Sequence, residues 1–256
     1  MRFYSHLLNV AILSCISSAA LMAQSSANPA VPAPAPQAVP HPAPCVIPDW
    51  PNFARYHDAD AATQPPAANE DRVVFMGDSI TDGWHLDQLF PGKPYINRGI
   101  SGQTTSQMVL RFRPDVLALH PKVVVILAGI NDIAENTGPI SLEAIEGNFT
   151  SMVDLAQANG IRVVLSSVLP AAKLPWRPAI DPVEKVAELN TWIKDLAAKR
   201  SLIYLDYFTA MDDGHHGLKA AYAHDAVHPN ADGYAAMAPL AQAAITQALA
   251  APAPSH

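Results

Sequence analysis

The sequence predicts an α/β fold, a three-layer α/β/α sandwich with a parallel sheet of about five strands. Short apolar, β-branched runs alternate along the chain with longer segments of helical periodicity, and this alternation is typical of parallel α/β proteins. The runs are continuously apolar, as expected for strands buried on both faces. Polar residues gather directly after several runs, where open α/β sheets bind their ligands.

Predicted strands and helices alternate from residue 72 to residue 249. Asn159-Gly160 is typical of a helix end and Pro182 of a helix start. Right-handed crossovers place the carboxyl ends of all parallel strands at one edge of the sheet. The strand-like runs are Arg72–Met76, Tyr95–Asn97, Val123–Ala128, Arg162–Val168 and Leu202–Asp206. The helix-like segments are Thr104–Phe112, Leu142–Gln157, Val183–Lys199 and Ala231–Leu249.

Length and composition fit one such domain, at residues 49–249. The chain has 256 residues and 50% of them are hydrophobic, which suits a sizeable core with additional sequence at both ends. The formal net charge is -7. Because nucleic-acid binding needs a basic face, we expect no nucleic-acid partner. The oligomeric state is left open.

Residues 1–23 are predicted to be a secretory signal peptide. A positive charge at Arg2 precedes the mainly apolar stretch Leu7–Ile16, and small residues follow. Cleavage is expected after Ala20 or Ala23. Because the apolar stretch is too short for a membrane span, we expect an exported protein, periplasmic or extracellular, with no stable membrane insertion after cleavage.

Two further segments lie outside the predicted domain. Residues 24–48 are rich in alanine and proline without a periodic apolar face, which is typical of a semi-rigid linker. Residues 250–256 are predicted to be a disordered tail. Cys15 stands in a loose lipoprotein-like pattern, but the apolar run before it is too short, so no lipid anchor is expected there. After cleavage Cys45 is the remaining cysteine, and no intrachain disulfide is expected.

The most informative segment is the end of the first predicted strand. Val73-Val74-Phe75-Met76 runs directly into Gly77-Asp78-Ser79, so a serine hydroxyl stands at the end of a buried strand. A serine in this place is suited to nucleophilic attack if a base lies near it. Alternatively, Ser79 caps the next helix, which is a common role of serine. The tripeptide alone does not decide between the two.

Three other polar loops are expected at the same edge of the sheet. The first follows the second predicted strand, the second follows the third predicted strand, and the third lies between the last predicted strand and the last predicted helix. A glycine-containing loop, an Asn-Asp pair and an Asp/His loop thus converge on the serine. The segments are Asn97–Thr105, Gly129–Asp132 and His224–Asn230. Their conjunction is a much stronger signal than any one of them.

These four blocks, in this order, resemble the SGNH or GDSL hydrolase superfamily of serine esterases and lipases. The resemblance covers roughly Arg72–Leu249 and implies a flavodoxin-like fold and esterase activity. The glycine block also resembles that of platelet-activating-factor acetylhydrolase catalytic subunits, and the chain is similar to carbohydrate acetylesterases. Thr81 stands where a Gly-x-Ser-x-Gly elbow needs its second glycine, which disfavours the α/β-hydrolase fold.

Matched to these blocks, Ser79 is the expected nucleophile, His228 the general base and Asp225 the residue that orients the imidazole. Asp225 lies close enough in sequence to accept a hydrogen bond from the second ring nitrogen of His228. In the alternative, Asp225 caps the C-terminal helix and His228 is incidental. The match of all four blocks favours catalysis.

An oxyanion hole is expected from three donors: the backbone N–H groups of Ser79 and Gly102, and the side-chain amide of Asn131. Glycine at position 102 lets the backbone approach the substrate closely. Asparagine supplies an N–H donor that aspartate lacks. Asn131 could instead satisfy its own turn, a frequent use of asparagine.

Four residues are weaker candidates for contact with the substrate. Asp78 is expected to hold the nucleophile turn, Asp132 to organise its loop at the edge of the site, and His224 to touch the leaving group. Trp176, between two prolines in a loop, either stacks on a sugar or an acyl chain or is an exposed loop anchor.

A stretch near the C-terminus contains potential metal ligands, namely His215, His216, His224 and His228 with Asp212 and Asp213. Their spacing matches no compact metal motif, and His228 already has a role, so no metal site is expected. The expected mechanism needs no cofactor.

The sequence therefore predicts an exported serine carboxylic-ester hydrolase that releases short acyl groups, chiefly acetyl, through a Ser-His-Asp triad and an acyl-enzyme intermediate. Its partner is expected to be a small-molecule or carbohydrate ester, and the expected natural substrate is an O-acetylated carbohydrate. The first alternative is a lipolytic enzyme acting on lysophospholipids or similar esters. The second, from another class, is a non-catalytic carbohydrate-binding module on the same scaffold. The joint presence of a serine, an asparagine, an aspartate and a histidine in the four blocks disfavours that module.

Overall fold

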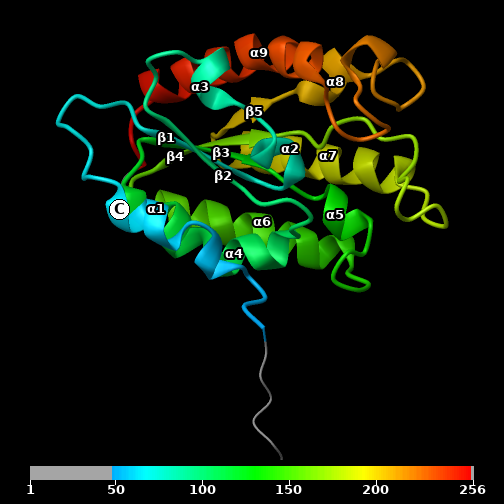
Figure 1. The fold of residues 1–256 in the computed structure, drawn as a ribbon, viewed down its shortest axis with the longest axis horizontal. Helices are drawn as coiled ribbons and strands as arrows, with labels where there is room; N and C mark the ends of the chain where they lie inside the picture. The colour runs from blue at the N-terminus through cyan, green and yellow to red at the C-terminus, as the bar shows by residue number, and fades with distance from the viewer. Residues whose placement is uncertain (1–47, 255–256) are drawn as a thin grey trace, which may run out of the picture. The chain divides into compact units, whose positions relative to one another are not determined.

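Five parallel strands form the sheet of the computed structural model, which describes residues 48–254 (Figure 1). Their spatial order is β2-β1-β3-β4-β5. The strands are β1 (Val73–Gly77), β2 (Tyr95–Gly99), β3 (Val123–Leu127), β4 (Arg162–Ser166) and β5 (Ile203–Leu205). The predicted fold class is confirmed, and each strand lies within a residue or two of its predicted bounds.

The order of the strands reverses around β1, which lies between β2 and β3. At such a switch point the loops after neighbouring strands diverge and leave a crevice at the carboxyl edge of the sheet. Every residue of β1 and β3 is buried, which explains their continuous apolar sequence. Gly77 at the end of β1 is paired with Gly99 and with Leu127, so the loops after these three strands begin at the same level.

Helices cover both faces of the sheet (Figure 1). On one face α4 packs beside α6 and α6 beside α7, whereas α9 packs across β3, β4 and β5 on the other face. The long helices are α4 (Thr105–Asp115), α6 (Leu142–Gln157), α7 (Val183–Lys199) and α9 (Ala231–Ala250). Helices α6 and α7 have their predicted bounds, and α4 continues past the predicted end at Phe112 to Asp115.

Several short helices shape the loops, and the sequence pattern did not predict them because one helical turn is too short to show a period. Two of them carry candidate site residues: α2 follows β1 and begins with Ser79, and α5 follows β3 and contains Asn131. The short α-helices are α1 (His57–Ala62), α2 (Ser79–Asp82), α3 (Leu86–Leu89), α5 (Ile130–Ile133) and α8 (Tyr207–Met211). The 3₁₀ helices are η1 (Phe53–Arg55), η2 (Leu117–Leu119) and η3 (Ala220–Tyr222).

The predicted signal peptide, Cys15, Cys45 and all of the predicted linker before residue 48 lie outside the described residues. At the other end, the segment predicted as a tail begins inside α9, which runs to Ala250. The Nε atom of Arg162 donates a hydrogen bond of 2.8 Å to the carbonyl of Ala251. This bond fixes the start of the segment at the amino end of β4.

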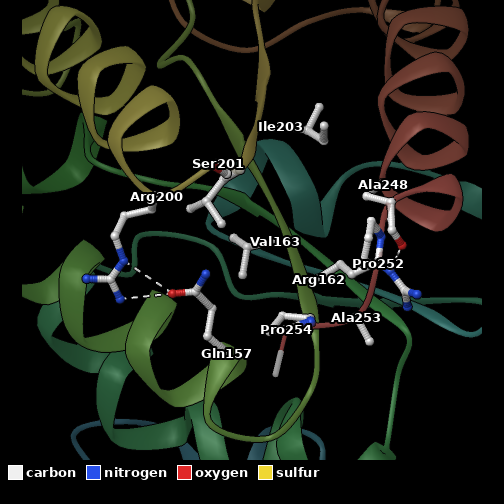
Figure 2. Close-up of a pocket in the computed structure, with 12 residues that line it drawn as sticks. Gln157, Arg162, Val163, Arg200, Ser201, Ile203, Ala248, Pro252, Ala253 and Pro254 are labelled. Carbon is white, nitrogen blue, oxygen red and sulfur yellow. Dashed lines mark hydrogen bonds between the residues drawn. The ribbon is translucent and has the colours of Figure 1, made fainter. Parts of the chain in front are cut away.

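A pocket of about 330 Å³ lies where this C-terminal segment passes the amino ends of β4 and β5 (Figure 2). Arg162, Arg200 and Pro254 are among its lining residues. Arg200 is held at its rim by hydrogen bonds to Gln157. Because the pocket is at the sheet edge opposite to Ser79, we assign it no part in catalysis. Between residues 48 and 254, no helix is long and apolar enough to cross a membrane.

Candidate active site

The candidate nucleophile stands at the start of α2, where β1 ends. Asp78, not Ser79, is the N-cap of this helix, because its Oδ1 atom accepts a hydrogen bond of 3.0 Å from the backbone N–H of Ile80. Capping by Asp78 satisfies the helix end. The hydroxyl of Ser79 is therefore available for another partner, and the side chain is half-buried at the sheet edge.

That partner is His228, which comes from the loop before α9. The Oγ atom of Ser79 lies 2.9 Å from Nε2 of His228. On the other side of the ring, Nδ1 lies 2.8 Å from Oδ2 and 3.1 Å from Oδ1 of Asp225. Because a carboxylate can only accept, Nδ1 donates to Asp225 and Nε2 is left as the acceptor for the serine proton. Serine, imidazole and carboxylate thus form one continuous chain of hydrogen bonds.

The loop itself positions Asp225. Its Oδ1 atom accepts hydrogen bonds of 2.8 Å from the backbone N–H groups of Val227 and His228. Partial burial raises the pKa of the carboxyl, but these two bonds and the bond from the ring outweigh it, so the pKa of Asp225 is lowered. The carboxyl therefore stays ionised beside the imidazole. Asn230, and not Asp225, caps α9.

The backbone N–H groups of Ser79 and Gly102 are placed to bind an oxyanion. Gly102 has φ of +79°, a conformation that residues with a Cβ rarely adopt. In the part of the chain that the structure describes, the N–H groups of Ser79 and Gly102 donate to no other residue. A developing negative charge could therefore recruit both donors without breaking an existing bond.

The third candidate donor, Asn131, is 3% exposed. Its Nδ2 atom donates to the carbonyl of Gln103 at 3.1 Å, and its Oδ1 atom accepts from Nδ2 of Asn136 at 2.8 Å. One N–H of the amide thus remains. Asn131 is carried by α5, whose N-cap Gly129 has φ of +114°, and a Cβ there would stand 2.7 Å from Leu189. A larger residue at 129 would displace the helix that bears the amide.

Asp78 and Asp132 lie beneath the site, not on its surface, since each is 1% exposed. Burial raises the pKa of Asp78 to about 7 and that of Asp132 to about 6. Asp132 accepts hydrogen bonds from the backbone N–H and the hydroxyl of Thr105. It thereby joins α5 to the start of α4, as expected of a loop organiser. The expectation that these two residues contact substrate is not supported by their burial.

Trp176 lies beside the ring of His228, whereas His224 contacts His228 through its backbone. The indole of Trp176 is 6.2 Å from the imidazole of His228 between ring centroids, and its Nε1–H donates to Oδ1 of Asn136 at 2.9 Å. Trp176 is therefore exposed beside His228 and held in place by its hydrogen bond to Asn136. His224 is exposed, and its backbone N–H donates to the carbonyl of His228. It supports the loop through its backbone.

The structure does not gather the potential metal ligands near the C-terminus into a cluster. Within residues 48–254, no three side chains of histidine, cysteine, aspartate or glutamate come together in a way that could hold a metal ion. Asp213 instead accepts hydrogen bonds from the backbone N–H groups of His215 and Gly217. A mechanism without a metal remains a prediction.

Two adjoining clefts lead to the site. One of about 510 Å³ is lined by Ser79, His228 and Ser101. The other, of about 500 Å³, shares Ser101 and is lined by Gly102 and Asn136. Both are open to solvent. A substrate can therefore lie across Ser101, with its carbonyl group between the nucleophile and Gly102.

Sequence reasoning missed Asn136, which contacts two oxyanion candidates and Trp176. It stands in a turn-forming stretch, Asn136-Thr137-Gly138-Pro139, where asparagine is common for local reasons. Gln103 was also missed as a partner of Asn131. No pattern in the sequence indicates either contact, because both depend on how the loops fold back.

A serine, a histidine and an aspartate joined in this order at the carboxyl edge of a parallel sheet are the arrangement of a serine hydrolase. Residues 75–236 match the model of the GDSL-like lipase/acylhydrolase family, and the chain belongs to this family. The resemblance to SGNH and GDSL hydrolases is thereby confirmed. The protein is an enzyme, a hydrolase of the esterase class.

Three relatives illustrate the similarity. A GDSL-like lipase of Bacteroides thetaiotaomicron is 44% identical, with a TM-score of 0.75 over 77% of this chain and 98% of that one. The acetylxylan esterase of Geobacillus stearothermophilus is 25% identical over 204 residues, 66% of this chain and 90% of that protein. YqeF, a lipoprotein of Bacillus subtilis, is 35% identical over 78 residues, which are 29% of this chain and 32% of that protein.

Proposed function

We propose that this enzyme hydrolyses esters of short acyl groups through a covalent acyl-enzyme on Ser79. The observation that carries the proposal is the continuous chain of hydrogen bonds from Ser79 through His228 to Asp225. A neutral hydroxyl is a weak nucleophile, and a neighbouring base in hydrogen-bond contact activates it. Family membership supports the reaction class.

In the acylation step, Oγ of Ser79 attacks the ester carbonyl while Nε2 of His228 accepts the hydroxyl proton. Asp225 stabilises the imidazolium that forms and keeps the proton on Nδ1. The tetrahedral intermediate then collapses, and Nε2 returns the proton to the departing alkoxide, which leaves as an alcohol. In deacylation, water replaces the alcohol: His228 removes its proton, and the acyl group leaves as the carboxylic acid.

The negative charge of each tetrahedral intermediate falls on the former carbonyl oxygen. We assign its stabilisation to the N–H groups of Ser79 and Gly102 and to the remaining N–H of Asn131. Preorganised donors act mainly in the transition state, where this charge develops. The unused backbone donors and the fixed amide of Asn131 support this assignment.

As the natural substrate we propose an O-acetylated carbohydrate. The relative from Geobacillus stearothermophilus is an acetylxylan esterase. The clefts beside Ser79 are open, which suits an acetyl group carried on a bulky polymer better than a long acyl chain that needs an enclosed apolar tunnel. Exposed Trp176 beside His228 and exposed Trp50 at the second cleft offer faces on which sugar rings could stack.

A substrate comparison tests this function. The purified enzyme is assayed with p-nitrophenyl esters of acetate, butyrate and decanoate, then with acetylated xylan and with a lysophospholipid. The proposal predicts the highest kcat/KM for acetate and release of acetate from xylan. Higher kcat/KM for decanoate, together with hydrolysis of the lysophospholipid, would support the lipolytic alternative. Absence of turnover with every one of these esters would contradict the proposed function.

Export is a separate part of the proposal. It is supported by the apolar stretch Leu7–Ile16 after Arg2 and by the similarity to a lipoprotein. Cell fractionation tests it: a shortened protein in the periplasm or the medium is expected. Full-length protein in the cytoplasm would contradict export, whereas a shortened protein in the membrane fraction would indicate a lipid anchor at Cys15.

A further inference from the structure

We propose that Asn136 is a positioning residue that orients the amide of Asn131, and that the indole N–H of Trp176 sets the orientation of Asn136 in turn. The three side chains form a relay from the rim of the site to the oxyanion donor. The inference rests on the proposed function, since it concerns how one of the proposed donors is aimed.

Asn136 uses both ends of its side-chain amide. Nδ2 donates to Oδ1 of Asn131 at 2.8 Å and to the carbonyl of Gly102 at 3.3 Å. Oδ1 accepts from Nε1 of Trp176 at 2.9 Å. One half-buried residue thus contacts two of the three elements of the proposed oxyanion hole and the aromatic residue beside His228.

The chemistry of the partners decides which way each amide faces. An asparagine amide has nearly the same shape when its oxygen and nitrogen are exchanged, so only its hydrogen-bond partners fix the orientation. The indole N–H of Trp176 can only donate, and the carbonyl of Gly102 can only accept. Asn136 must therefore turn its oxygen to Trp176 and its nitrogen to Gly102 and Asn131.

The same argument then applies to Asn131. Because Asn136 presents N–H, Asn131 must present its oxygen to Asn136 and its nitrogen to the carbonyl of Gln103. The second N–H of Asn131 is left for the substrate. If the amide were reversed, its oxygen would face the carbonyl of Gln103, and the hole would lose its side-chain donor.

The backbone brings Asn136 to this place. Its N–H donates to the carbonyl of Asn131 at 3.0 Å, so the chain turns back over the end of α5. Glu135, one residue earlier, has φ of +55°, a left-handed conformation that residues with a Cβ rarely adopt. The turn thus accepts a strained residue directly before Asn136.

A double-mutant cycle tests the relay, with kcat and KM for p-nitrophenyl acetate as readout. The variants are Asn136→Ala, Asn131→Ala and the two combined. We expect Asn136→Ala to lower kcat by about 10-fold or more with little change in KM, less than loss of a direct donor, which lowers kcat by about 10²–10³. In the Asn131→Ala background, Asn136→Ala should have no further effect, because the amide it orients is gone.

Two further variants separate orientation from loss of structure. Asn136→Asp keeps the size of the side chain and removes its N–H donors, so it should lower kcat by about 10-fold or more, and it serves as the test if the alanine variant fails to fold. Trp176→Phe keeps the ring beside His228 and removes the indole N–H, so it should lower kcat in wild type and have no effect in Asn136→Ala. Asn159→Ala, in the exposed turn after α6 and away from the site, is the matched control and should leave kcat unchanged.

The outcomes distinguish the relay from the proposed function. Normal kcat in Asn136→Ala and Asn136→Asp, with Asn131→Ala impaired, would overturn the relay and leave the proposed function intact. Additive losses in the double variant would also overturn it, because Asn136 would then act independently of Asn131. Full kcat in Asn131→Ala would overturn both the role of Asn131 as an oxyanion donor and its orientation by Asn136. The proposed nucleophile is tested separately by Ser79→Ala.

Discussion

The hydroxyl of Ser79 and the imidazole of His228 are 2.9 Å apart although 149 residues separate them in the chain. The sheet makes this contact possible, since Ser79 follows a central strand and the loop of His228 precedes α9, which packs on the same sheet. The proposed reaction follows from this pair, with Asp225 behind the ring.

Ser79→Ala should abolish esterase activity and leave the fold intact. Removal of a triad member leaves only binding and the oxyanion hole, so kcat should fall by roughly 10⁴-fold or more. The side chain is half-buried and is not the cap of α2, so the thermal midpoint should change little. Steady-state assay with p-nitrophenyl acetate, alongside circular dichroism, measures both. Near-wild-type turnover in the folded variant would remove Ser79 from the mechanism.

Asn131→Ala should lower kcat by about 10²–10³ and change KM little, because an oxyanion donor acts chiefly in the transition state. The measurement is a full kinetic curve with an acetyl ester. A higher KM with an unchanged kcat would instead assign Asn131 to ground-state binding of the substrate.

The value of kcat/KM should rise with pH and then reach a plateau. Because the buried carboxyls of Asp78 and Asp132 have pKa values raised to about 7 and about 6, the rising step should be broader than that of a single group. A base must be uncharged to accept the serine proton, and an imidazole changes its charge near neutral pH. Because the pKa of Asp225 is lowered, this carboxylate stays ionised across the step and adds no second one. A pH–rate profile from acid to mildly alkaline pH tests this. A flat profile would exclude His228 as the base.

Asp225→Asn should lower kcat by up to about 10⁴-fold, as in the best-studied triad, because an amide permits the wrong tautomer of the ring. The backbone bonds to Oδ1 can be kept by the amide oxygen, so the loop should keep its shape. Kinetics at the plateau pH give the effect. An unchanged rate would contradict the role of Asp225.

Between pH 5 and pH 7, the free energy of unfolding should fall less with rising pH in Asp78→Asn than in the wild-type protein. Burial raises the pKa of Asp78 from 3.8 to about 7, so between these values the native state binds more protons than the unfolded state, and the free energy of unfolding falls as pH rises. The variant removes this contribution, at most about 1.4 kcal/mol for each pH unit. Urea unfolding at pH 5 and pH 7 measures the difference. An equal change in the free energy of unfolding from pH 5 to pH 7 in both proteins would show that Asp78 is ionised over this whole range.

Chelators should leave the activity unchanged, because the proposed steps require no metal. Assays before and after dialysis against EDTA provide the check. Activity that disappears with EDTA and returns with zinc would instead indicate that the histidines near the C-terminus bind a metal ion.

The sequence predicted the sheet well because its strands are buried on both faces, and burial requires apolar residues throughout, as in Val123–Leu127. It also predicted Ser79, Asp225 and His228 as neighbours, since all carboxyl-end loops of a parallel sheet meet at one edge. The family and the reaction class are confirmed by the comparisons. The roles of the individual residues stay predictions.

The rest depends on how the loops pack, which local sequence does not determine. Asp78, Asp132 and Asp225 have the same residue type, yet the first two are buried, and of the three only Asp225 accepts a hydrogen bond from a histidine ring within residues 48–254. Only the tertiary structure distinguishes their environments. Asn136 acquires its contacts because the turn after α5 folds back over Asn131. The residue types of this stretch predict a turn, but not that the turn packs on Asn131.

The central claim is that Ser79 becomes acylated, and active-site labelling tests it most directly. The enzyme is treated with a fluorophosphonate probe, digested and mapped by mass spectrometry. The account predicts one labelled residue, Ser79, with loss of esterase activity in proportion to labelling, and no label in Ser79→Ala. Label on a different residue, or full activity in enzyme whose Ser79 is completely labelled, would contradict it.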